Sequence, residues 1–245
     1  MSAPGRHGNV ARRSCPPLAL FLVSILMILG GNAHAAAPHS SAIDITPAED
    51  EVWVVNPDHG SVGIITTTGY TFVTEVVVGA EPWCVDIHPS NGEAWVTSLA
   101  ENKVYVVDVA TRSVLTTIDV GFEPFGVAFN PSGTVALVTC SGSDELMVVD
   151  VATRTVTNTL DTYRRPRGIC WQADGERAYV SHLLMPEFIG KLTRFFSSTT
   201  TTDEMFVFQN FGQTPAGYPS TMQNLTIAPA PYDNILWMPN QMINT

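Results

Sequence analysis

Short apolar runs alternate with turn-forming residues along most of the chain. Between positions 82 and 120 the runs are PWCVDIH (Pro82–His88), EAWVTS (Glu93–Ser98), KVYVVDV (Lys103–Val109) and SVLTTIDV (Ser113–Val120). Valine, isoleucine, threonine and aromatic residues dominate these runs, which favours β-strands. The separating letters PSNG, LAEN and ATR are typical of tight turns, and none of the runs has a helical period. The pattern predicts an all-β protein.

The pattern also repeats along the chain. YVVDVATRSV (Tyr105–Val114) recurs as MVVDVATRTV (Met147–Val156), 42 positions later. The same spacing relates aromatic, proline and aspartate positions: Trp53, Trp95, Leu137 and Tyr179; Pro82, Pro124 and Pro166; Asp108 and Asp150. Four antiparallel strands in a unit of roughly 40 residues are typical of a β-propeller blade. Because neighbouring blades cover both faces of a blade, strands that are apolar on both sides, such as VYVVDV, are expected.

Four segments at matching positions carry a resemblance to a known family. They are WVVN at 53–56, WVTS at 95–98, LVTC at 137–140 and YVSH at 179–182. With the recurring VDVATR turn, they resemble the YVTN-type β-propeller repeat, which is WD-repeat-like, over roughly Ser41–His182. The resemblance implies an exported, usually seven-bladed propeller that often serves as a binding platform. It also implies an alternative, since some related propellers are lactonases, carry redox cofactors or are joined to c-type cytochrome domains.

The repeat predicts blades at 41–79, 80–121, 122–163 and 164–221, and a partial blade at 222–245. The fourth blade is long, because Tyr179 and the next matching aromatic residue, Trp237, are 58 positions apart rather than 42. We place the extra length around Ser197–Asp203 and Gly212–Ser220. About four and a half blades make an incomplete ring that leaves apolar blade faces bare. We therefore expect a fragment of a longer propeller that expresses poorly or associates when it is isolated. An unusual closure of the ring and its completion by another chain are the alternatives.

The N-terminus resembles an export signal. Arg6, Arg12 and Arg13 precede a stretch of 12 residues, LALFLVSILMIL (Leu18–Leu29), and an A-x-A site ends at Ala35. The stretch is shorter than the roughly 18 residues that span a bilayer, and this order of features is typical of a cleaved secretory signal peptide over 1–35. An uncleaved membrane anchor is the alternative. The signal peptide predicts a periplasmic or extracellular protein.

Charge limits the possible partners. All 23 acidic residues and only nine of the 12 basic ones lie beyond Ala35, which gives that part a formal net charge of −14. Such a surface opposes contacts with nucleic-acid phosphates and docking on anionic lipid after signal cleavage.

Beyond Ala35 the chain has Cys84, Cys140 and Cys170, so at least one thiol of a monomer is unpaired.

Candidate binding residues lie in the connections between strands at one end of the blades. In a propeller, the loops between the fourth and first strands and between the second and third strands share one face. The candidate residues on this face are Glu81, Trp83, Glu123, Phe125, Arg164, Arg165, Arg167 and His182. The three arginines stand out in an acidic protein, and guanidinium groups bind carboxylates and phosphates through paired hydrogen bonds. The alternative is that they neutralise Glu81 and Glu123 on neighbouring blades.

Two weaker constellations could hold a metal ion. Cys140 and His182 occupy the same repeat position, and with Met185 they offer soft ligands suited to copper. Asp44 and Asp86 share a position on the innermost strand, but Ala128 and Cys170 follow in the next two blades, so their ring is incomplete. Structural roles are the preferred reading of both sets. The sequence shows no C-x-x-C-H, G-x-S-x-G or H-E-x-x-H motif, and we expect no catalytic residue, metal or cofactor.

Two functions remain open. The first is an exported, non-catalytic propeller that binds a protein or a small anionic ligand on its loop face. The second is the propeller portion of a larger extracytoplasmic enzyme, either a c-type-cytochrome-linked redox protein or a lactonase-like hydrolase.

Overall fold

The computed structural model describes residues 40–90, 92–183, 190–208, 218–222, 226–227, 236–237 and 240–243. The expected signal peptide and Met185 lie outside them. All described residues belong to one unit, Ala35–Thr245. Apart from one short 3-10 turn, η1 (Pro57–His59), their regular structure is β-strand, as the all-β prediction requires. No helix among them is long and apolar enough to cross a membrane.

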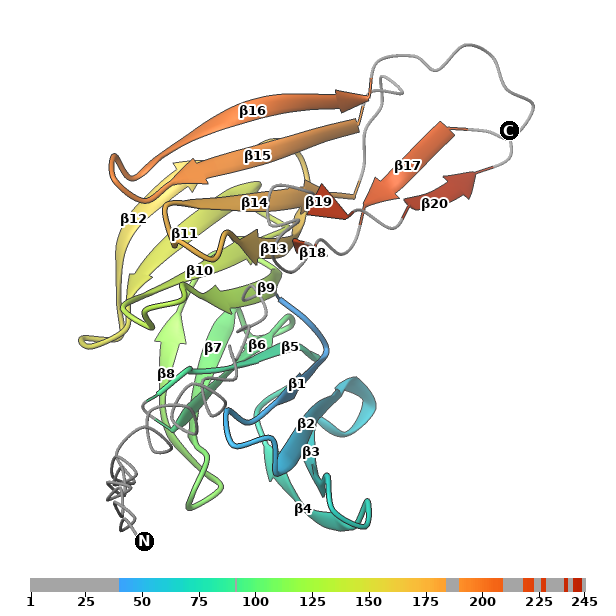
Figure 1. Ribbon diagram of the computed structural model, residues 1–245, viewed down its shortest axis with the longest axis vertical. Coiled ribbons are helices and arrows are strands. Elements are labelled where there is room, and N and C mark those ends of the chain that lie inside the picture. The colour runs from blue at the N-terminus through green and yellow to red at the C-terminus, as the bar shows by residue number, and fades with distance from the viewer. Residues whose placement is uncertain are drawn as a thin grey trace, which may run out of the picture. The chain divides into compact units, whose positions relative to one another are not determined.

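Four antiparallel sheets of four strands each follow one another along the chain, and within each sheet the strands lie side by side in chain order (Figure 1). The first sheet contains β1 (Ile43–Ile45), β2 (Glu51–Asn56), β3 (Ser61–Thr66) and β4 (Phe72–Val77). The second contains β5 (Pro82–Ile87), β6 (Glu93–Ser98), β7 (Lys103–Asp108) and β8 (Ser113–Asp119). The third contains β9 (Pro124–Phe129), β10 (Val135–Cys140), β11 (Glu145–Asp150) and β12 (Thr155–Asp161). The fourth contains β13 (Pro166–Trp171), β14 (Arg177–His182), β15 (Gly190–Phe196) and β16 (Thr201–Phe208).

The strands of the second sheet match the expected ones to within one residue at each end. Burial explains why apolar and polar residues do not alternate along these strands. All six residues of β6 and all six of β9 are buried, whereas β8 exposes all but one of its seven. Inner strands are covered on both faces and the outermost strand faces solvent, as expected of stacked propeller blades.

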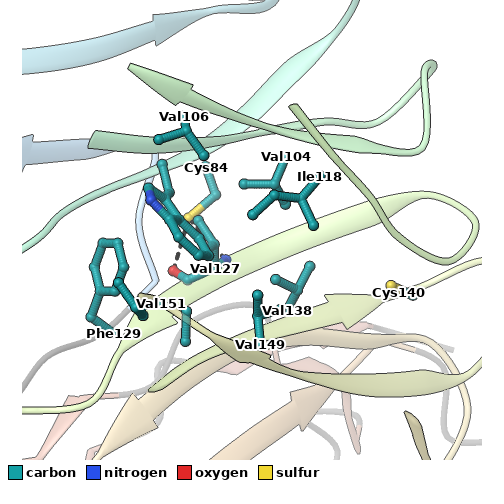
Figure 2. Close-up of a cluster of buried hydrophobic side chains, with 12 residues drawn as sticks. Cys84, Val104, Val106, Ile118, Val127, Phe129, Val138, Cys140, Val149 and Val151 are labelled. Carbon is teal, nitrogen blue, oxygen red and sulfur yellow. Dashed lines mark hydrogen bonds between the residues drawn. The ribbon is translucent and has the colours of Figure 1, made fainter. Parts of the chain in front are cut away.

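Each sheet packs on the next through an apolar layer. Trp53 and Trp95, which occupy equivalent positions in the 42-residue repeat, are both fully buried. Trp53 lies in the layer between the first and second sheets, and Trp95 in the layer between the second and third. Figure 2 shows the latter layer, where Val104 and Val106 of β7 face Val138 and Val149 of the third sheet. A third layer joins the third and fourth sheets around Trp171.

The recurring VDVATR turn is closed by its own hydrogen bonds and also contacts the preceding sheet. Asp108 accepts hydrogen bonds from the backbone N–H and the hydroxyl of Thr111, at 2.6 and 2.8 Å, and closes the turn. Asp150 does the same with Thr153. The arginine that ends each turn has a positive φ of 54° and reaches back to the preceding sheet. Arg112 pairs with Glu51 there.

A hydroxyl in the YVTN-like segment forms a second type of link between sheets. Thr139 accepts a hydrogen bond from the N–H of Gly126 at 2.8 Å and donates to the carbonyl of Arg167 in the next sheet at 2.7 Å. Thr97 makes the same two bonds one repeat earlier, from the N–H of Cys84 and to the carbonyl of Phe125. The threonines therefore link β5 to β9 and β9 to β13.

Of the two segments expected to hold the extra length of the fourth blade, Ser197–Asp203 does not hold it, and most of Gly212–Ser220 lies outside the described residues. Ser197–Thr200 is a four-residue turn between β15 and β16, the same length as the turns that precede Ser113 and Thr155. Residues 201–203 belong to β16, because threonine favours strands. Part of the extra length instead lies between β14 and β15, where seven residues (183–189) connect the strands against four (99–102) in the second sheet.

Two short strands lie where the repeat predicts a partial blade. β18 (Thr226–Ile227) pairs with β19 (Leu236–Trp237), with Thr226 opposite Trp237. Asp86 is opposite Trp95 in the second sheet, so the pairing follows the expected repeat. β17 (Tyr218–Met222) pairs with β20 (Asn240–Ile243). Over the described residues the sheets do not form a closed ring, and the exact blade limits stay a prediction.

Candidate binding face at the ends of the innermost strands

The predicted binding residues lie where the innermost strands begin. β5, β9 and β13 each start with a proline, which suits the first position of a strand because it donates no hydrogen bond there. The next residue in each strand is Trp83, Phe125 or Arg167, and these are spaced by 42. Equivalent positions on adjacent blades bring the three side chains into one row, which we call the stacking row.

The stacking row is continuous. The rings of Trp83 and Phe125 lie 5.1 Å apart between centroids, at 44° to each other. The guanidinium carbon of Arg167 lies 4.0 Å from the centroid of the Phe125 ring. Phe125 is buried between its two neighbours, while Trp83 is 40% exposed. The row therefore presents an aromatic surface at one end and a cation at the other.

Arg167 carries a charge that no carboxylate within 4.0 Å neutralises among the described residues. It is half-buried, and its Nε atom is buried with no hydrogen-bond partner in that part of the chain. Burial lowers the pKa of Arg167, and the neighbouring charge of Arg165 lowers it further. An arginine remains charged at neutral pH even so. The site thus holds a partly desolvated cation in a position suited to an anion.

Arg165 has a different role. Its guanidinium pairs with Glu123 at 2.7 Å, and its backbone N–H donates to Asp144 at 2.7 Å. Arg165 and Glu123 therefore neutralise each other across two blades, which is the structural role considered for these arginines above. Neither Glu81 nor Arg164, both exposed, has an ion pair within the described residues. Arg164 and Arg167 are the two cations left for a ligand.

His182 is buried beside this face rather than open to it. Its Nδ1 lies 3.1 Å from the carbonyl of Arg164 and its Nε2 lies 2.9 Å from the hydroxyl of Thr193. Tyr163 covers it edge-to-face at 5.7 Å. Burial lowers the pKa of His182 to about 4, so the ring is neutral at pH 7. The structure thus shows His182 holding the β12–β13 connection that carries Arg164.

The two constellations considered for metal ions have structural partners. Burial raises the pKa of the Cys140 thiol to about 12, so it is not a thiolate at neutral pH. Asp44 accepts a hydrogen bond from the N–H of Ile87 at 2.7 Å, and Asp86 accepts one from the N–H of Phe129 at 2.6 Å. Each aspartate therefore links its innermost strand to the next one. Within the described residues no three His, Cys, Asp or Glu side chains gather as a metal site.

Two hollows border the stacking row. The first, which we call the mouth pocket, has a volume of about 240 Å³ and is lined by Ser40–Ala42, Trp83, Cys84, Phe125 and Gly126. The second, which we call the rim groove, has a volume of about 780 Å³ and is lined by Pro57–Gly60, Val77, Gly79–Glu81 and Trp83. Trp83 is the residue common to both.

Sequence reasoning missed the wall of the mouth pocket that precedes β1. Ser40 donates its N–H to the carbonyl of Ile169 in β13 at 2.9 Å, and its hydroxyl accepts from the N–H of Ile169 at 2.7 Å. Ser41 bridges to Val85 in β5. The 42-residue spacing identifies Ser41 as the counterpart of Trp83, but no pattern in the sequence indicates that Ser40 contacts a strand 129 positions later.

No family model and no curated protein matches this sequence. Solved structures do resemble it. Hydrazine synthase of Kuenenia stuttgartiensis matches with a TM-score of 0.66 at 19% identity, over 80% of this chain and 54% of that one. A functionally unknown protein of Desulfotomaculum acetoxidans DSM 771 matches with a TM-score of 0.56 at 19% identity, over 79% and 59% of the two chains. The Cps50 (Swd1) β-propeller domain of Myceliophteria thermophila matches with a TM-score of 0.64 at 12% identity, over 83% and 62%.

The chain therefore spans between 54% and 62% of the length of these three structures. Identities this low show a shared fold and nothing about activity. Together with four successive four-stranded antiparallel sheets, they establish that this chain has the β-propeller fold.

Proposed function

We propose that this protein is an exported β-propeller of the YVTN-repeat type that binds a ligand without catalysing its conversion. The ligand lies on the face formed by the stacking row and the loops around it. One observation supports this most directly: Arg167 is half-buried against Phe125 and has no carboxylate within 4.0 Å among the described residues. A partly desolvated cation is stabilised when an anion or carboxylate joins it.

Asp86 and His182, two buried groups with shifted pKa values, are not placed to act on a ligand at this face. Asp86 and His182 are buried and hydrogen-bonded within the fold, and neither opens into the two hollows. A catalytic acid or base would have to reach a substrate. The enzyme alternative can be tested separately, since purified protein that retains a stoichiometric metal ion or haem would support it.

The anion site is tested by replacing the two available cations. Arg164→Ser with Arg167→Ser should weaken binding of phenylacetate at least tenfold in a calorimetric titration, while the melting temperature changes little. Phenylacetate is the probe because its carboxylate suits Arg167 and its ring suits the aromatic row beside that cation. The control is Arg177→Ser, which removes an exposed arginine from β14. Equal affinity in the double variant, or no binding by the unmodified protein, would refute the anion site.

Export is tested by producing the full chain in a bacterial host and sequencing the N-terminus of the periplasmic protein. A start at Ala36 is expected. A product that keeps residues 1–35 and sediments with membranes would instead support the anchor alternative.

A further inference from the structure

The rim groove has the opposite charge to the arginine end of the stacking row. Asp58 and Glu81 line it and are exposed. Its one basic side chain within the described lining is His59, whose Nδ1 lies 3.9 Å from Glu75. Neither Asp58 nor Glu81 has an ion-pair partner within 4.0 Å in the described part of the chain. This end of the face is therefore suited to a cation.

Apolar surface separates the two charged ends. Val77 is 73% exposed in the rim groove, and Trp83 lies between that groove and the mouth pocket. Phe125 then continues the row to Arg167. Along one direction the face thus presents carboxylates, an exposed aliphatic and aromatic surface, and guanidinium groups.

The scale of this arrangement suits a polypeptide better than a small molecule. The contacts of 5.1 Å and 4.0 Å along the stacking row alone correspond to roughly three residues of extended chain at about 3.3 Å each. The rim groove adds a hollow of about 780 Å³ beyond Trp83. An extended segment also places separate side chains at separate sites, so one molecule can satisfy both charged ends.

We propose that the loop face binds an extended, charge-polarised segment of another polypeptide. A basic side chain of the segment lies at Asp58 and Glu81, and an apolar or aromatic side chain packs on Trp83. An acidic side chain, or a terminal carboxylate, reaches Arg164 and Arg167. This inference rests on the proposed binding function and specifies its partner: electrostatic complementarity selects the segment and sets its direction.

Three peptides of equal length test the proposal. Each has a central phenylalanine flanked by glycines, and the ends are two lysines and two glutamates, four lysines, or four glutamates. Calorimetry should give the bipolar peptide at least a tenfold lower Kd than either uniformly charged peptide. Raising the salt concentration should weaken its binding, because Asp58, Glu81 and Arg164 are exposed.

Charge-reversal variants identify the two ends. Asp58→Lys with Glu81→Lys should weaken the bipolar peptide at least tenfold and strengthen the all-glutamate peptide. Arg164→Glu with Arg167→Glu should weaken the bipolar peptide and strengthen the all-lysine peptide. The matched control is Glu49→Lys with Glu176→Lys, which reverses two exposed charges in the β1–β2 and β13–β14 connections. The control should leave the order of affinities unchanged.

The outcomes separate this inference from the proposed function. Phenylacetate binding without a preference for the bipolar peptide would overturn the polypeptide proposal and leave the anion site standing. Loss of affinity in the control equal to that in the charge-reversal variants would overturn it too. Absence of both phenylacetate and peptide binding would overturn both proposals.

Discussion

The guanidinium of Arg154 donates a hydrogen bond to the carboxylate of Glu93, 61 residues earlier in the chain, over 2.6 Å. The same relationship joins Arg112 to Glu51. In both cases the glutamate also accepts a hydrogen bond from the indole of the tryptophan two positions later. In both copies of the turn, the arginine therefore links its own blade to the preceding one.

Breaking this link should lower stability. Burial raises the pKa of Glu93, but hydrogen bonds from Arg154 and Trp95 outweigh it, and the pKa lies below its ordinary value of 4.5. Arg154→Met should reduce the free energy of unfolding in urea by about 1–2 kcal/mol, since a partly buried carboxylate loses its partner. A lowered pKa stabilises the fold above the ordinary value, and that stability is lost as pH falls through the folded value. The difference from the unmodified protein should therefore shrink in acid. A deficit that is constant from pH 7 to pH 3 would contradict the assignment.

The bridging hydroxyl of Thr139 gives a second prediction. Thr139→Val keeps the shape of the side chain but leaves the N–H of Gly126 and the carbonyl of Arg167 without this partner. The free energy of unfolding should fall by about 1–3 kcal/mol. Thr117→Val, at an exposed position of β8, is the control and should change it little. Equal effects of the two variants would show that the bridge contributes nothing to stability.

Asp86 predicts an unusual pH dependence. Burial raises the pKa of its carboxyl, and the neighbouring charge of Asp44 raises it further. A raised pKa gives stability that is complete below the ordinary value of 3.8 and is lost as pH rises through the folded value. Asp86→Asn keeps an acceptor for the N–H of Phe129 without the buried charge. The variant should melt at a higher temperature than the unmodified protein at pH 8 and at a similar one at pH 4. A lower melting temperature at pH 8 would contradict this.

The outer face of the first sheet predicts self-association. Ile43 is 52% exposed and Ile45 is 45% exposed. Their counterparts 42 positions later, Val85 and Ile87, are buried against the first sheet. Ile43→Ser with Ile45→Ser should therefore decrease the concentration-dependent mass measured by light scattering, because apolar area is removed from the contact. Unmodified protein that stays monomeric at all concentrations would exclude this face as a contact.

Features that recur every 42 residues could be predicted from the sequence, because each depends on the residues of its own strand or turn. The strands of the second sheet, the Asp108 turn and the alignment of Trp53 with Trp95 all follow from the 42-residue spacing and strand composition. The prediction of extra length at Ser197–Asp203 was wrong. A run of threonines after Ser197 looks like a loop by composition, yet threonine also favours strands, and pairing with β15 decides the outcome.

The candidate site was predicted in part. The sequence identified the residues of the stacking row, but not which arginine would remain unpaired. That depends on Glu123 reaching Arg165 rather than Arg167, which is a matter of side-chain geometry across two blades. The rim groove and the mouth pocket are lined by residues from separate segments of the chain, so no sequence motif predicts them.

The bond between Ser40 and Ile169 has a consequence for how the protein is made. A ribosome releases Ser40 long before Ile169, which lies 129 residues further on. Ser40 therefore cannot form these two hydrogen bonds until β13 of the fourth sheet has been synthesised. Contacts so distant in sequence slow folding, so the pairing of Ser40 with β13 is expected to form late.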